Sequence, residues 1–173
     1  FHRKNITIQT FVHIISCMND SGYFEYNGDK PKEFGEQKYQ ESIKNYQQME
    51  KRFKDLPDTR IVMVGTSPYD ETVQLKENTP FKIKNETIKR LVEYQKESAA
   101  KNNWEFTDLN APMTAINQQY QQKDPTFTLC GSDRIHPDND GHMVMAYLFL
   151  KAQGFVGKEV ADMEINANKK QAV

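Results

Sequence analysis

The chain alternates between short, continuously apolar segments and longer amphipathic ones. Residues 6–17 are β-branched and aromatic, and from Phe11 onward they are apolar on nearly every position, which predicts a strand buried on both faces. Later apolar runs predict two further strands, and spacings of three and four between apolar residues predict four helices. These elements are expected as strands at 60–66 and 104–109, and as helices at 36–56, 84–102, 111–123 and 140–151.

This order of strand and helix is the one that builds a parallel sheet with right-handed crossovers, so an α/β fold with three parallel strands is predicted. The last helix is apolar nearly all round and is expected to be covered on most sides, with Asp138 or Asn139 as its N-cap and Gly154 just past its end. The first strand is the most hydrophobic, which conflicts with a place at an exposed sheet edge. His13 within it is predicted to be a core residue.

Composition and charge say little more about the fold, but they exclude several classes of function. The chain has 173 residues, with 23 basic and 24 acidic side chains, so no overall charge attracts it to nucleic acid. No run approaches the ~18 apolar residues of a membrane-spanning helix. A glycine-rich phosphate loop is also missing from the sequence.

Candidate chemistry lies in three polar segments that are expected to meet off the carboxyl ends of the predicted strands, where a parallel sheet has its binding crevice. These segments are 17–20, 66–70 and 133–137. Asp133 stands three residues before His136, a spacing at which a carboxylate can orient an imidazole and leave Nε2 as a general base. Spacing alone favours the ordinary alternative, a turn-capping Asp beside a solvated His. Asn19 can donate to an oxyanion, although Asn-Asp-Ser-Gly is also ordinary turn chemistry.

Metal and thiol chemistry were weighed against this assignment. A calcium loop through residues 136–147 fails because Tyr147 stands where a bidentate Glu is needed. A zinc site from His136, His142 and a nearby Asp stays an alternative, as does Cys17 as a nucleophile or in a disulfide with Cys130. The prediction is that the site uses no metal and no cofactor.

The segments Cys17-Met18-Asn19-Asp20 and Asp133-Arg134-Ile135-His136-Pro137, in this order and context, resemble the Gly-x-Asn-Asp and Asp-x-x-His-Pro blocks of the SGNH (GDSL-type) hydrolases. This resemblance covers roughly residues 8–155. It implies a flavodoxin-like three-layer α/β/α fold and an ester hydrolase, with acylated carbohydrate as the preferred substrate class. By resemblance, His136 is the general base, Asp133 its orienting carboxylate and Asn19 an oxyanion donor, while Asp20 shapes the loop.

The sequence also departs from that family. Its Gly-Asp-Ser block, which carries the nucleophilic Ser, is not found here, and Cys17 replaces a Gly. We therefore expect residues 1–155 to be a partial SGNH-like domain that supplies strands 3, 4 and 5 of the family's sheet, with strands 1 and 2 and the Ser lying upstream. The chain alone is expected to be inactive, and 156–173 to be a tail that begins a further strand or domain.

Two further expectations follow from the resemblance. The first strand should pair with the N-terminal part or with another chain, and the protein should be periplasmic or secreted. The alternative from another class is a non-catalytic binding module on the same fold, which would keep the crevice without the chemistry.

Overall fold

A computed structural model describes residues 10–76, 79–158, 165–166 and 171–172 of the chain. Its main sheet has three parallel strands in the order β1-β2-β3. The strands are β1 (Thr10–Ser16), β2 (Thr59–Gly65) and β3 (Glu105–Asp108). The helices are α1 (Pro31–Lys54), α2 (Lys84–Lys101), α3 (Asn110–Gln121) and α4 (Asn139–Ala152), with a 3-10 turn at Phe24–Asn27.

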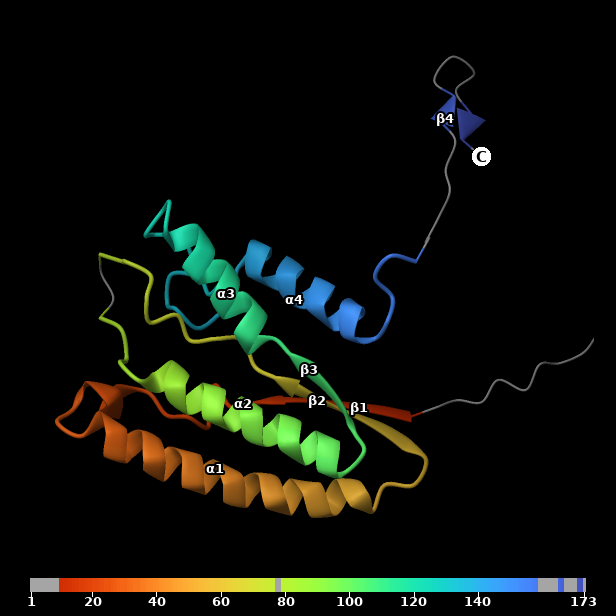
Figure 1. Ribbon diagram of the computed structural model, residues 1–173, viewed down its shortest axis with the longest axis horizontal. Coiled ribbons are helices and arrows are strands. Elements are labelled where there is room, and N and C mark those ends of the chain that lie inside the picture. The colour runs from red at the N-terminus through yellow and green to blue at the C-terminus, as the bar shows by residue number, and fades with distance from the viewer. Residues whose placement is uncertain (1–9, 77–78, 159–164, 167–170, 173) are drawn as a thin grey trace, which may run out of the picture.

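Figure 1 shows α1 and α2 on one face of the sheet and α3 and α4 on the other. The central strand β2 is buried from Ile61 to Gly65, because both of its edges pair and both of its faces are covered. One apolar cluster joins β2 to α1 and α2, and a second joins it to α3 and α4. The predicted α/β fold with a small parallel sheet is therefore confirmed.

The helix boundaries show how local chemistry sets each element. Helix α1 begins five residues earlier than predicted, because Pro31 occupies its first turn, where a missing N–H costs nothing. Helix α4 is capped by Asp138, whose side chain accepts a hydrogen bond from the backbone N–H of Gly141 at 3.2 Å. This was one of the two predicted caps.

The predicted burial of the first strand is wrong. Within the described residues β1 pairs only with β2, so it is an edge strand, and Phe11 and Ile15 are 43% and 56% exposed. His13 is exposed rather than a core residue, and its ring packs edge-on against Phe149 at 4.9 Å. Residues 6–9 of the predicted strand lie outside the described residues.

The predicted cover of the last helix is also wrong. Met143, Tyr147 and Leu150 on α4 are 71%, 51% and 49% exposed, and their spacing of four and three places them on one stripe. The inner side of α4 packs through residues such as Val144 and Leu148. An apolar helix face is thus left open on the described part of the chain.

The tail contains a second, separate sheet in which β4 (Ile165–Asn166) pairs antiparallel with β5 (Gln171–Ala172). The predicted further strand at 160–167 lies mostly outside the described residues. No helix in the described part of the chain is long and apolar enough to cross a membrane.

Candidate functional site

The candidate base and its carboxylate are joined in one tight turn. Oδ2 of Asp133 lies 2.6 Å from Nδ1 of His136, and Oδ1 of the same carboxylate accepts the backbone N–H groups of Ile135 and His136 at 2.9 Å. The ring of His136 is open to solvent, since its side chain is 81% exposed. With Nδ1 engaged by the carboxylate, Nε2 is the nitrogen left to act on a substrate.

The charge of Asp133 is favoured by these contacts. Partial burial acts to raise its pKa, but the hydrogen bonds from His136 and from the two backbone N–H groups outweigh it and hold the pKa below the usual value. The carboxylate therefore stays ionised at neutral pH, as the orienting partner of an imidazole must.

Arg134 fixes this turn to the loop that follows β2. Its side chain is 2% exposed, and its guanidinium donates to the carbonyl oxygens of Asp70 (3.0 Å) and Val73 (2.7 Å). The backbone N–H of Asp70 returns a hydrogen bond to the carbonyl oxygen of Arg134 at 3.0 Å. Arg134, one of the two residues between Asp133 and His136, thus anchors the pair to the fold.

Asn19 lies in the turn that follows β1. Its Oδ1 accepts a hydrogen bond from the hydroxyl of Tyr23 at 2.5 Å, and its side chain is exposed. Asp20 closes the turn by a hydrogen bond, because its Oδ2 accepts the backbone N–H of Cys17 at 3.1 Å. Cys17 itself has φ of 97°, the left-handed region that favours glycine.

The three polar segments meet on one apolar cluster. Tyr69, Ile88 and Val92 form its buried centre, and Met18 and Ile135 pack against it. Met18 precedes Asn19 and Ile135 precedes His136, so the two turns lie over the same patch of core. The charge of Asp133 also acts on the hydroxyl of Tyr23, the group that contacts Asn19.

Two alternatives find no support in this geometry. Cys17 and Cys130 are both free and fully buried, and burial raises the pKa of each thiol to about 12. Among the residues described, no three His, Cys, Asp or Glu side chains are grouped so that they could hold a metal ion. Nδ1 of His142 instead contacts the carbonyl oxygen of Asp138 at 2.9 Å.

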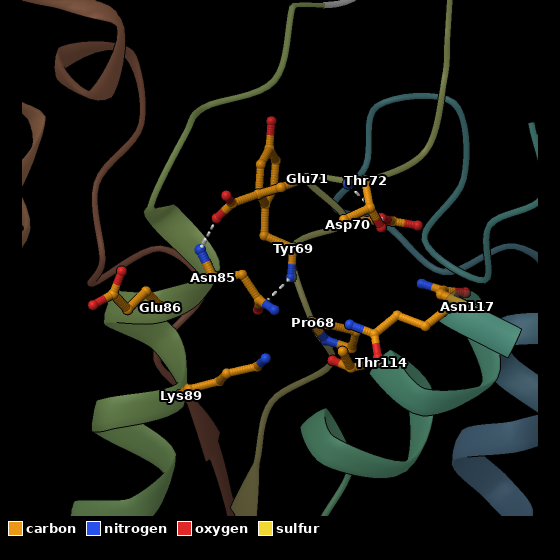
Figure 2. Close-up of a pocket in the computed structure, with 11 residues that line it drawn as sticks. Pro68, Tyr69, Asp70, Glu71, Thr72, Asn85, Glu86, Lys89, Thr114 and Asn117 are labelled. Carbon is orange, nitrogen blue, oxygen red and sulfur yellow. Dashed lines mark hydrogen bonds between the residues drawn. The ribbon is translucent and has the colours of Figure 1, made fainter. Parts of the chain in front are cut away.

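A separate polar pocket of about 250 Å³ lies between α2 and α3 (Figure 2). Asn85 and Lys89 line it from α2, and Thr114, Asn117 and Gln118 line it from α3. The segment 68–72 forms a further wall of the pocket. Glu71 connects this segment to α2 by accepting a hydrogen bond from the backbone N–H of Asn85. Asn19, Asp133 and His136 are not among its lining residues.

Sequence reasoning missed Tyr23, Lys84 and Arg134. Lys84 is the clearest case, because it is fully buried and its Nζ donates to the carbonyl oxygen of Met18 at 3.0 Å and to Oγ of Ser21 at 2.6 Å. A lysine at the start of an amphipathic helix gives no sign in the sequence that it will be buried.

Comparison with known proteins gives structural neighbours only. No family model and no curated protein matches the chain. It is similar to the solved structure of a gut microbial diltiazem-metabolizing enzyme, with 80% identity over 94% of this chain and 37% of that one, and a TM-score of 0.85. The chain therefore spans little more than a third of that protein.

Two more distant structures share the fold. A variant of Axe2, an acetyl-xylooligosaccharide esterase from Geobacillus, aligns with a TM-score of 0.59 at 20% identity, over 89% of this chain and 62% of that one. The acetyl xylan esterase AlAXEase aligns with a TM-score of 0.50 at 17% identity, over 82% and 66%. The α/β architecture of this chain is thus one that is also found in esterases.

Proposed function

We propose that this chain is part of an SGNH-type ester hydrolase and carries the general base, its orienting carboxylate and one oxyanion donor. The observation that carries the proposal is the hydrogen bond of 2.6 Å between Asp133 and His136. The turn that holds this pair packs on the same apolar cluster as the turn that holds Asn19. The esterases among the structural neighbours agree with this chemistry. A Ser nucleophile is proposed to come from polypeptide upstream of Phe1.

The proposed reaction runs through an acyl-enzyme. Nε2 of His136 takes the proton of the Ser hydroxyl as its oxygen attacks the acyl carbon, and Asn19 donates its side-chain N–H to the oxyanion. Collapse of the tetrahedral intermediate breaks the ester C–O bond, and the imidazolium returns the proton to the leaving alcohol. Water then repeats the sequence on the acyl-enzyme and releases the acid.

Acylated carbohydrate is the proposed substrate class, on the strength of the acetylated xylan and xylooligosaccharide named for the two distant neighbours. A periplasmic or secreted location is proposed with it. We also propose that the open edge of β1 pairs with a strand from polypeptide outside residues 1–173, since the 80% identical protein is much longer than this chain.

The test compares His136→Ala with His142→Ala in the intact gene product, assayed on p-nitrophenyl acetate and on acetylated xylooligosaccharide. The first variant should lose about 10³-fold or more in kcat, and the second should keep it. Serine-hydrolase rates from residues 1–173 alone, or equal activity in both variants, would overturn the proposal.

A non-catalytic binding module is the second candidate, and the polar pocket between α2 and α3 is the observation that favours it. It predicts that the intact protein hydrolyses no ester, while a xylooligosaccharide perturbs NMR signals of Asn85 and Lys89. Hydrolysis that depends on His136 would rule this candidate out.

A further inference from the structure

The amide of Asn19 has one engaged end and one open end. A carboxamide accepts through its oxygen and donates through its NH₂ group. Because the hydroxyl of Tyr23 donates to Oδ1 of Asn19 at 2.5 Å, the oxygen is occupied and Nδ2 is the end that remains for another acceptor. The hydroxyl proton of Tyr23 therefore decides which end of the Asn19 amide, Oδ1 or Nδ2, faces away from Tyr23.

Tyr23 is itself held by the buried side chain of Lys84, which is an ammonium below its pKa of about 7. Nζ of Lys84 lies 4.0 Å from the centroid of the Tyr23 ring, and Phe81 packs on that ring edge-on at 6.2 Å. A cation over an aromatic face is attracted by the ring quadrupole, more so where water is excluded. Lys84 is fully buried, so this contact fixes the plane of the phenol.

Nζ of Lys84 also donates hydrogen bonds to residues on both sides of Asn19 in the sequence. Its acceptors are the carbonyl oxygen of Met18, Oγ of Ser21 and the carbonyl oxygen of Gly22. Three acceptors match the three N–H groups of a protonated lysine. The turn that presents Asn19 is therefore tied to the first residue of α2.

We infer that Tyr23 is a positioning residue that turns Nδ2 of Asn19 toward the oxyanion, and that Lys84 holds Tyr23 and the turn in place for it. The inference rests on the proposed function, in which Asn19 is the oxyanion donor. Neither Tyr23 nor Lys84 touches the reacting atoms in this scheme.

The electrostatic surroundings keep Tyr23 a donor. Partial burial raises the pKa of its hydroxyl, and the charges of Asp133 and Asp20 raise it further. The phenol therefore keeps its proton at neutral and mildly alkaline pH. Asp133 also orients His136. The charge of this one carboxylate therefore acts both on the proposed base, His136, and on Tyr23, which positions the oxyanion donor.

The kinetic test is Tyr23→Phe in the intact protein, which keeps the ring on Lys84 and removes only the hydroxyl. We expect kcat to fall about 10-fold, a part of the loss for deleting an oxyanion donor, with KM changed less than about 2-fold. In an Asn19→Ala background the same substitution should have no further effect. Tyr120→Phe, an exposed tyrosine on α3, is the matched control and should keep the full kcat.

A second readout needs no activity. In ¹H–¹⁵N spectra of the intact protein, the Asn19 side-chain amide signal, identified by its loss in Asn19→Asp, should shift in Tyr23→Phe and not in Tyr120→Phe. An unshifted signal overturns the inference whatever the kinetics. A shifted signal with full kcat in Asn19→Ala instead overturns the oxyanion role of Asn19, and with it the proposed function.

Discussion

One carboxylate holds both the ring and the backbone of His136. Oδ2 of Asp133 accepts from Nδ1 of the imidazole at 2.6 Å, and Oδ1 accepts the backbone N–H of His136 at 2.9 Å. The tautomer of the ring is therefore fixed, and so is the backbone from which the ring projects, although the side chain is 81% exposed. Orientation at so open a position depends on Asp133 rather than on packing.

Asp133→Asn should therefore separate orientation from fold. The amide keeps the size of the side chain and can still accept the backbone N–H groups, but its NH₂ end cannot accept from Nδ1. We expect kcat of the intact protein to fall by about 10²–10⁴-fold, with the melting temperature within about 3 °C of wild type. Asp140→Asn, an exposed acid in the first turn of α4, is the control. Full kcat in Asp133→Asn would remove Asp133 from the mechanism.

The two thiols should be inert in the folded chain. Cys17 and Cys130 are fully buried, and burial raises both pKa values to about 12, so almost no thiolate exists at neutral pH. Mass spectrometry after iodoacetamide at pH 8 should show no adduct on the native chain and two after unfolding in urea. Rapid alkylation of Cys17 in the native chain would restore the cysteine-nucleophile alternative.

The order and type of the elements could be predicted because they follow from local patterns. The spacing of apolar residues was enough for α2, and the Pro and Asp signals account for the starts of α1 and α4. What failed was burial. An apolar pattern shows that a face of β1 or α4 is suited to be covered, but it does not show whether the same chain supplies the cover, and here Ile15 and Met143 are exposed.

The candidate site, too, has a part that the sequence could predict and a part that it could not. Asp133 and His136 are three residues apart, so their pairing was visible as a local spacing. Lys84 meets Met18 from 66 residues away and Arg134 meets Asp70 from 64, and such contacts exist only once the chain has folded. Cys17 is intermediate: its place in a glycine block was visible, and its φ of 97° shows why that turn favours glycine.

Lys84 should leave a signature in the pH dependence of stability. Burial lowers its pKa to about 7, against an opposing effect of the Glu71 carboxylate. The unfolded chain keeps that proton up to the ordinary lysine pKa of about 10.4. Between these values the unfolded chain binds more protons, so the penalty for burying the ammonium, complete below about pH 7, is relieved as the pH rises.

Urea titrations can isolate this effect by difference. The free energy of unfolding of wild type minus that of Lys84→Met should increase from pH 7 to pH 9, by at most about 1.4 kcal/mol per pH unit. Lys89→Met, at an exposed lysine on the same helix, is the matched control. A constant difference for Lys84→Met would show that its pKa is not lowered in the folded protein.

The open edge of β1 should make residues 1–173 self-associate when they are isolated. Phe11 and Ile15 are exposed on a strand whose second edge has no partner among the described residues, and unpaired apolar edges recruit other strands. Ile15→Lys places a charge on that strand and should lower the weight-average mass in sedimentation equilibrium toward that of a monomer. Leu56→Lys, an equally polar change at an exposed leucine beyond α1, should leave the association unchanged. If both variants behave like wild type, or if the isolated wild-type chain is monomeric at about 100 μM, the edge does not recruit a strand, and the proposed pairing of β1 in the intact protein loses its basis.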